Sequence, residues 1–519
     1  MRTLGGDRLL LHKACMKDTR QTILQEIESK VKSADGHNVI WIRGSPGVGK
    51  SALAASILTR LEDQDRPVIS FRFDRTQSTK ITTDALWRVV ASDLVRKYPS
   101  LCQHLVEGNR QLRSSDIDRL FKLLIETPLS TLDDDIPPEQ LPVIVIDALD
   151  ECGGLRHDSS GTEDFEGLLR TLKRWALVDH LKRFKVVITS RPEENIIRMF
   201  PKTISTHVNI PSGSDVRLGD SASDDICTFL KSRLDAMGVE PAWITKALEY
   251  LVPRAVGIFI WATTVADFLS VNPKIRFDNL KRGDETEGLD DLHSLYLTVI
   301  ATSFRRATKP EIKAITSVIG ATIFAKQPLD DTTLMRLPGV ESPHMLNYIR
   351  NGLMSVIDSN PILRFHHRSF EDFLLSNSFR QHLPNLSNVQ DRDLHERQLA
   401  ALCLNCMVSS ELHFNMCNLN SSSIENVDIP STNKSAITPL ISYSSQFWID
   451  HLVQTRREEI LMKAVEFVMY EKLLFWIEVM SISGKAHEVS AILKRALEWL
   501  RSAVCPEFIS CNTILRLTG

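Results

Sequence analysis

The stretch Val39-Ile40-Trp41-Ile42-Arg43-Gly44-Ser45-Pro46-Gly47-Val48-Gly49-Lys50-Ser51 decides the fold of this chain. It begins as an apolar, largely β-branched run that is typical of a buried strand, and it continues as a glycine-rich loop. Residues 52–58, which read Ala-Leu-Ala-Ala-Ser-Ile-Leu, are a good opening for a helix. A strand, a loop of this spacing and a helix in this order predict a phosphate-binding loop in an α/β domain.

Each position of this loop has a predicted role. Its glycines let successive backbone amides surround phosphate oxygens, and the amino terminus of the following helix adds partial positive charge. Lys50 is expected to reach the β- and γ-phosphates, and Ser51 to hold Mg²⁺. The predicted nucleotide-binding residues are Gly44, Ser45, Pro46, Gly47, Val48, Gly49, Lys50 and Ser51. The alternative is an ordinary glycine-rich turn that carries a surface lysine.

A second buried-strand run, at residues 142–146, ends in the acids of Asp147-Ala148-Leu149-Asp150-Glu151. Asp147 is placed to hold the metal ion, and Asp150 or Glu151 to orient and deprotonate a water molecule aimed at the γ-phosphate. The alternative is a solvated acidic turn.

A third run, Val186–Thr189, continues into Ser190-Arg191-Pro192. Ligands of open α/β sheets lie at the carboxyl ends of the strands, so Arg191 is a candidate sensor of the γ-phosphate. Its alternative role is an ion pair with Glu193 or Glu194.

Together these three motifs resemble the NACHT domain of STAND signalling NTPases, in particular the fungal proteins with a nephrocystin-3-like amino-terminal domain. The likeness extends to Ala14-Cys15 with Thr19-Arg20, to residues 257–262 (Gly-Ile-Phe-Ile-Trp-Ala) and to residues 365–374 (Phe-His-His-Arg-Ser-Phe-Glu-Asp-Phe-Leu). Roughly residues 12 to 480 are covered. The chain departs from the usual family organisation in two ways, because it shows neither an amino-terminal signalling module nor carboxyl-terminal repeats. Two interpretations therefore stay open: a fragment of a longer gene product, or a short family member that works with separate partners.

The resemblance implies further site residues. In the family a winged-helix histidine reaches the bound diphosphate, and His367 occupies that position, with its neighbour His366 the weaker candidate. Thr19 and Arg20 would lie near the base, whereas their alternative role is a helix start capped by Asp18 or Thr19. The family also implies ADP or GDP in the resting state, signal transduction in fungal innate immunity, and self-association or binding to other signalling proteins.

The fold class that we predict is an α/β P-loop NTPase domain, a parallel sheet with helices on both faces, followed by all-α and winged-helix domains. Predicted strands are Val39–Arg43, Val68–Phe73, Val143–Asp147, Lys185–Thr189 and Thr206–Ile210. The predicted domains are an amino-terminal helical segment (1–35), the NACHT P-loop domain (36–211), a helical domain (212–290), a winged-helix domain (291–385) with a short strand at 360–365, and a carboxyl-terminal helical domain (386–519).

The composition limits the kinds of partner that we expect for this chain. With 43% hydrophobic and 24% charged residues and a formal net charge of −3, the 519-residue chain is typical of a globular protein and has no dense basic run for nucleic acid. The longest uncharged segment, Ala255–Ala266, is about half the length that crosses a bilayer, so we expect a buried helix and no membrane partner.

The cysteines are scattered and odd in number, and a secretory signal is absent, which together predict a cytoplasmic location. Cys403 and Cys406 have the spacing of a metal pair, but their apolar helical context predicts core packing.

The predicted function is a Mg²⁺-dependent switch that binds ATP or GTP, hydrolyses it slowly, and changes conformation or self-associates. Its catalytic residues would be Asp150, Glu151 and Arg191, with Ser51 and Asp147 as metal ligands. The competing hypothesis is a scaffold that holds nucleotide permanently without turnover, and a metabolic P-loop kinase is a third.

Overall fold

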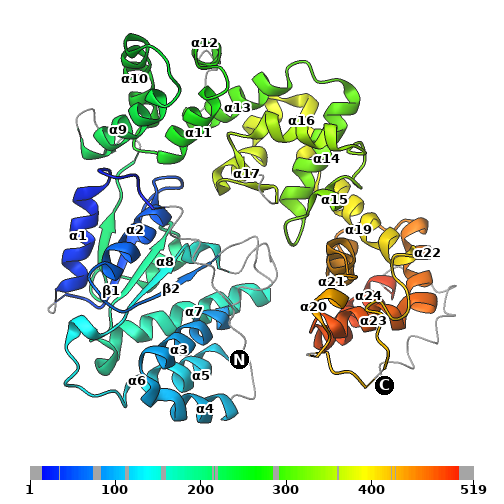
Figure 1. Cartoon of the computed structure of the whole chain (residues 1–519), viewed down its shortest axis with the longest axis horizontal. Coiled ribbons are helices and arrows are strands. Elements are labelled where there is room, and N and C mark those ends of the chain that lie inside the picture. Colours follow the sequence, from blue (N-terminus) through cyan, green and yellow to red (C-terminus); the bar gives the residue numbers. More distant parts are fainter. Residues whose placement is uncertain are drawn as a thin grey trace. The chain divides into compact units, whose positions relative to one another are not determined.

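The structure is a computed structural model that describes residues 14–33, 36–73, 83–111, 116–152, 159–212, 215–216, 220–283, 291–358, 362–421, 423–426 and 428–501. The chain forms two compact units, Met1–Leu295 and Tyr296–Gly519 (Figure 1). The finer domain boundaries predicted above stay predictions. In the described part of the chain, no helix has both the length and the apolarity that crossing a membrane requires.

A five-stranded sheet organises the first unit. Its strands are β1 (Val39–Arg43), β2 (Val68–Arg72), β3 (Val143–Asp147), β4 (Val186–Ser190) and β5 (Thr206–Asn209). They lie in the order β2-β3-β4-β1-β5, and every neighbouring pair is parallel. The five predicted strands are therefore confirmed, each to within one residue at either end.

Helices cover both faces of this sheet because side chains alternate between the faces along each strand. Ile40, Ile42 and Val145 pack with α1 (Gln21–Lys32) and α2 (Lys50–Glu62) in one core. Trp41 and Ile146 pack in a second core with the remaining helices, which are α3 (Thr83–Lys97), α4 (Cys102–Gln111), α5 (Ile117–Phe121), α6 (Thr127–Leu129), α7 (Ser159–Leu177) and α8 (Glu194–Met199). The predicted α/β P-loop architecture is confirmed.

Four helices follow the sheet within the first unit: α9 (Ser221–Asp235), α10 (Pro241–Ala255), α11 (Phe259–Leu269) and α12 (Pro273–Gly283). The expectation of one buried helix over Ala255–Ala266 is wrong. Val256 and Gly257 take left-handed backbone conformations, with φ of 44° and 78°, and these end α10 before α11 begins. The helical part of the segment, including Trp261 and Val265, is buried as expected.

The described residues of the second unit are mainly helical, with one pair of short strands. Helix α13 (Asp291–Phe304) leads into it, and its other helices are α14 (Lys309–Phe324), α15 (Asp331–Leu334), α16 (Pro343–Leu353), α17 (Arg368–Leu374), α18 (Asn377–His382), α19 (Arg392–Val408), α20 (Ser431–Lys434), α21 (Pro439–Leu452), α22 (Glu459–Phe467), α23 (Leu473–Ile482) and α24 (Val489–Arg501). Strands β6 (Ile357–Asp358) and β7 (Arg364–Phe365) pair antiparallel. The predicted strand at 360–365 is thus shorter, and residues 360 and 361 lie outside the described residues; the winged-helix assignment stays a prediction. Cys403 and Cys406 are buried in α19, in line with core packing.

Candidate functional site

The glycine-rich loop joins β1 to α2 at the carboxyl end of β1. Gly47 and Gly49 take φ of 77° and 94°, and Gly49 is the residue that caps α2. A left-handed backbone at two positions needs glycine, because a Cβ atom is strained there. Lys50, the first residue of α2, turns its Nζ back to donate to the Gly44 and Ser45 carbonyl oxygens, at 2.9 Å each.

The acids and the arginine of the other two motifs surround Lys50. Burial lowers the pKa of Lys50 from 10.5 to about 8, and the charges that act on it, after burial, are Asp150, Arg191, Asp147 and Glu151. These residues come together because β1 and β3 flank β4, so that all three carboxyl ends meet at one edge of the sheet. The structure thus brings the three predicted motifs together.

Asp147 ends β3 and is fully buried. Its Oδ1 accepts a hydrogen bond from the Thr189 hydroxyl at 2.6 Å, whereas its Oδ2 accepts none from the described residues. The Nε of Arg72 lies 3.6 Å from that second oxygen. A buried carboxylate oxygen without a hydrogen-bond donor is expensive unless a cation approaches it, so this group suits a metal ion.

Asp150 and Arg191 form a pair across the ends of β3 and β4. The Arg191 backbone N–H donates to Asp150 Oδ1 at 3.0 Å, and the Arg191 Nε lies 3.4 Å from Asp150 Oδ2. Both side chains are mostly buried, with 18% of Arg191 and 5% of Asp150 exposed. The structure therefore gives Arg191 an acidic partner that the sequence prediction, which considered Glu193 or Glu194, did not name.

Arg20 contacts the loop, and Thr19 precedes it in the chain. The Arg20 Nη2 donates to the Val48 carbonyl at 2.9 Å, and the Thr19 hydroxyl donates to the Met16 carbonyl at 2.7 Å. The alternative in which Asp18 or Thr19 caps α1 is wrong, because the capping position is Arg20, in a left-handed conformation and without a side-chain cap. Their predicted proximity to the base stays a prediction.

His367 belongs to the second unit, where it caps α17. Its Nδ1 accepts the Ser369 backbone N–H at 3.1 Å and lies 2.7 Å from the Ser369 hydroxyl, which in turn contacts the Tyr296 hydroxyl at 2.8 Å. The neighbouring His366 donates its backbone N–H to the Val356 carbonyl. A contact of His367 with nucleotide stays a prediction.

Four residues that touch these motifs were absent from the predicted site. Thr189 positions Asp147, and it could have been inferred from its place beside Ser190 and Arg191. Phe259 contacts Arg20 and Ile260 contacts Gly47 of the loop, and both belong to a segment that the family resemblance had marked, although without a role. Asp225 accepts the Arg20 backbone N–H, and its position in the first turn of a helix gave no signal of this contact.

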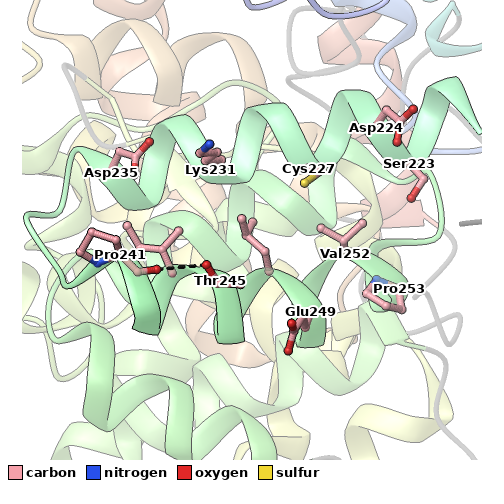
Figure 2. A pocket seen from close by; sticks show the side chains of 12 residues that line it. Ser223, Asp224, Cys227, Lys231, Asp235, Pro241, Thr245, Glu249, Val252 and Pro253 are labelled. Atoms are coloured by element: carbon pink, nitrogen blue, oxygen red, sulfur yellow. Dashed lines mark hydrogen bonds between the residues drawn. The ribbon is translucent and has the colours of Figure 1, made fainter. Parts of the chain in front are cut away.

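A separate cavity of about 690 Å³ lies between α9 and α10 (Figure 2). Apolar side chains such as Ile244, Leu248 and Val252 line it together with the charged Lys231 and Glu249. None of its lining side chains is a predicted site residue, so the cavity and the loop site are distinct features of the first unit.

Comparison with known proteins bears on this site. Residues 18–191 match the family described as nephrocystin 3, N-terminal, and this range includes the first two motifs and the third as far as Arg191. The chain is 24% identical to the vegetative incompatibility protein HET-E-1 of Podospora anserina, over 90% of this chain and 35% of the relative. The chain therefore spans about a third of the length of this curated relative.

Two solved structures have low similarity to the whole chain. One is a STAND protein with a tetratricopeptide repeat sensor from Pyrococcus horikoshii, with a TM-score of 0.38, 14% identity, and coverage of 94% of this chain and 64% of that one. The other is AMPPCP-bound DnaA from Aquifex aeolicus, with a TM-score of 0.29, 11% identity, and coverage of 75% and 96%. At these scores neither likeness carries an inference about function. Residues 18–191 therefore match a nephrocystin 3, N-terminal domain, and most of the chain is similar in sequence to HET-E-1.

Proposed function

We propose that the first unit binds ATP or GTP with Mg²⁺ and hydrolyses it slowly, and that the chain thereby acts as a conformational switch that self-associates in its triphosphate form. The observation that carries this proposal is the meeting of three features at one sheet edge: Lys50, the Asp150–Arg191 pair, and the Oδ2 of Asp147, which accepts no hydrogen bond from the described residues. A structural α/β domain has no need for so many buried charges in one place.

The residues present fit a phosphate group. A Cβ atom added at Gly49 would meet no atom within 4 Å, so there is open space beside the third glycine of the loop. The Lys50 Nζ donates to two backbone carbonyls of the loop, and it can exchange these for phosphate oxygens. The loop is thus arranged to receive an anion.

The residues also fit a divalent cation. Asp147 offers a buried carboxylate oxygen that accepts no hydrogen bond from the described residues and has only the Arg72 Nε, at 3.6 Å, as a nearby ion-pair partner among them. Ser51, next to Lys50 in the first turn of α2, offers a hydroxyl. Hard oxygen ligands of this kind suit Mg²⁺. When bound, Mg²⁺ would neutralise charge on the phosphate oxygens.

Chemical roles then follow for the remaining groups. The Asp150 carboxylate is engaged by Arg191, which favours Glu151 as the group that orients the attacking water and takes its proton. Arg191, held in place by Asp150, would supply a fixed positive charge beside the γ-phosphate. In the resting form His367 would contact ADP or GDP, as the family implies.

The proposal is tested by identifying the nucleotide that the purified chain releases on denaturation and by assaying turnover with Mg²⁺. Lys50→Ala is expected to abolish binding, whereas Glu151→Gln is expected to keep binding and to slow hydrolysis by at least about tenfold. Lys185→Ala is the control for Lys50, because the Lys185 Nζ likewise donates to two backbone carbonyls, but Lys185 precedes β4 at the opposite edge of the sheet. Glu194→Gln, an exposed acid in α8, is the control for Glu151.

Each result points in one direction. Bound nucleotide with turnover that is lost in Glu151→Gln supports an NTPase, and bound nucleotide without turnover supports the scaffold instead. The switch is tested by measuring molecular mass in solution with a diphosphate and with a non-hydrolysable triphosphate. A chain that stays monomeric with both contradicts self-association.

A further inference from the structure

Arg20 is buried against the nucleotide loop in a strained conformation. Its backbone has φ of 59° and its side chain is almost inaccessible to solvent. A non-glycine residue in the left-handed region costs about 1 kcal/mol or more, so surrounding contacts must hold it there. The Nη2 of Arg20 donates to the Val48 carbonyl oxygen at 2.9 Å.

Two residues beyond the sheet hold Arg20 in this position. Asp225 on α9 accepts the Arg20 backbone N–H with its Oδ1 at 2.9 Å. The ring of Phe259, at the start of α11, lies under the guanidinium group, with 4.6 Å between the guanidinium carbon and the ring centre. The carboxylate and the ring face offset the cost of burying the arginine charge.

The adjacent carbonyl of the loop is held in the same way. The Ile260 backbone N–H, in the first turn of α11, donates to the Gly47 carbonyl oxygen at 2.9 Å. The α9–α11 segment therefore fixes two successive loop carbonyls, that of Gly47 directly and that of Val48 through Arg20.

These contacts determine where the loop amides point. In a trans peptide group the C=O and the N–H point in opposite directions. The Gly47 C=O and the Val48 N–H belong to one peptide group, so a contact that holds this carbonyl on the outer side of the loop points the Val48 N–H to the inner side. In the same way, holding the Val48 carbonyl points the Gly49 N–H to the inner side. These are the kind of donors that surround phosphate oxygens in such a loop.

We propose that Arg20, held by Asp225 and Phe259, is a positioning residue that sets how tightly the loop holds nucleotide. This inference rests on the proposed nucleotide binding and adds Asp225 and Phe259 to the site. Movement of the α9–α11 segment away from the loop would release both carbonyls together, and nucleotide would then leave faster.

The experiment measures the release rate of a fluorescent ADP analogue from the full chain. Arg20→Ala and Asp225→Ala are each expected to accelerate release by roughly tenfold, the size of effect that loss of a charge-assisted hydrogen bond produces. Asp225→Asn should have a smaller effect, because its carboxamide oxygen still accepts the Arg20 N–H. The double variant should release no faster than Arg20→Ala alone, since Asp225 acts through Arg20.

A matched control separates positioning from general stability. Arg183 is also largely buried and also donates to backbone carbonyls, those of Asp133, Asp134 and Ile136, but it precedes β4 at the opposite edge of the sheet. Arg183→Ala should lower the melting temperature without changing the release rate. If Arg20→Ala does not fold, Arg20→Lys replaces it, with an expected intermediate release rate.

The outcomes are distinct. Additive effects of Arg20→Ala and Asp225→Ala, or release at the parent rate from both, overturn the positioning role while leaving nucleotide binding intact. A parent chain that binds no fluorescent nucleotide overturns the proposed function itself, and the positioning role falls with it.

Discussion

The Thr189 hydroxyl donates a 2.6 Å hydrogen bond to Asp147 Oδ1 and accepts the Ala148 backbone N–H at 2.9 Å. One side chain at the end of β4 thus orients the carboxylate at the end of β3 and supports the left-handed turn at Ala148, whose φ is 57°. The same arrangement leaves Asp147 Oδ2 without a hydrogen-bond donor among the described residues.

Asp147→Asn should therefore remove the response to Mg²⁺. In the parent chain with nucleotide, Mg²⁺ at about 100 times its dissociation constant should add about 2.7 kcal/mol to the free energy of unfolding. The variant should lose this gain but keep its metal-free stability, because the Asn oxygen still accepts the Thr189 hydroxyl. Melting curves with nucleotide, with and without Mg²⁺, measure both. An undiminished Mg²⁺ effect would show that the ion is held elsewhere; Asp179→Asn, an exposed acid, is the control.

The lowered pKa of Lys50 predicts a distinctive pH dependence of the free energy of unfolding. Burial lowers its pKa from 10.5 to about 8. Between these values the unfolded chain binds more protons than the folded chain, so this residue makes the free energy of unfolding rise as pH increases from 8 to 10.5. Urea unfolding of the nucleotide-free parent and of Lys50→Met measures this effect. Between pH 8 and 10.5 the free energy of unfolding should rise by up to about 3 kcal/mol more in the parent than in the variant. Parallel pH profiles would show that Lys50 is solvated in the free protein.

Alanine substitutions at Gly47 and Gly49 together test how closely α11 packs on the loop. A Cβ atom at Gly47 would lie 2.1 Å from Ile260 Cγ2, whereas one at Gly49 would meet nothing within 4 Å. Both positions have positive φ, so Gly49→Ala should cost about 1–2 kcal/mol in nucleotide-free stability and Gly47→Ala a further ~1–3 kcal/mol. Ile260→Ala should restore part of the stability lost in Gly47→Ala. Equal costs for the two glycine variants, measured by urea unfolding, would contradict this packing.

In the second unit, Glu396 is the buried centre of a charge cluster that the sequence did not indicate. Its carboxylate contacts His451 Nδ1 at 2.6 Å and Lys326 Nζ at 3.2 Å, it lies 3.6 Å from Arg392 Nε, and it is 1% exposed. Burial lowers the pKa of His451, so the positive charges beside Glu396 are those of Lys326 and the more exposed Arg392. Glu396→Gln should cost about 3–5 kcal/mol, because it leaves a largely buried lysine without its acid.

The control for this variant is Glu411→Gln, which removes a more exposed acid from its pair with Arg336 and should cost at most about 1 kcal/mol. Urea unfolding followed in the second unit compares the two. Similar costs would show that Lys326 and His451 find other partners or water.

Much of the first unit was predictable because its signals are local. Strand runs such as Val143–Asp147 are β-branched and apolar, and the glycine spacing from Gly44 to Ser51 allows few other backbone shapes. Parallel strands place their carboxyl ends at one edge, so Lys50, Asp147 and Arg191 could be expected near each other before any coordinates. The break at Val256 was not predictable, since a β-branched residue is a poor candidate for a left-handed turn.

The sequence by itself therefore determined the sheet, the phosphate loop and the set of residues at its edge. Only the tertiary structure decided which side chains hold that site in shape. Arg20 meets Asp225 across 205 positions of sequence, and Glu396 meets His451 across 55. Such contacts depend on how whole helices pack against the sheet and against one another. No local periodicity records them, because the same residues on a differently packed helix would be ordinary solvated charges.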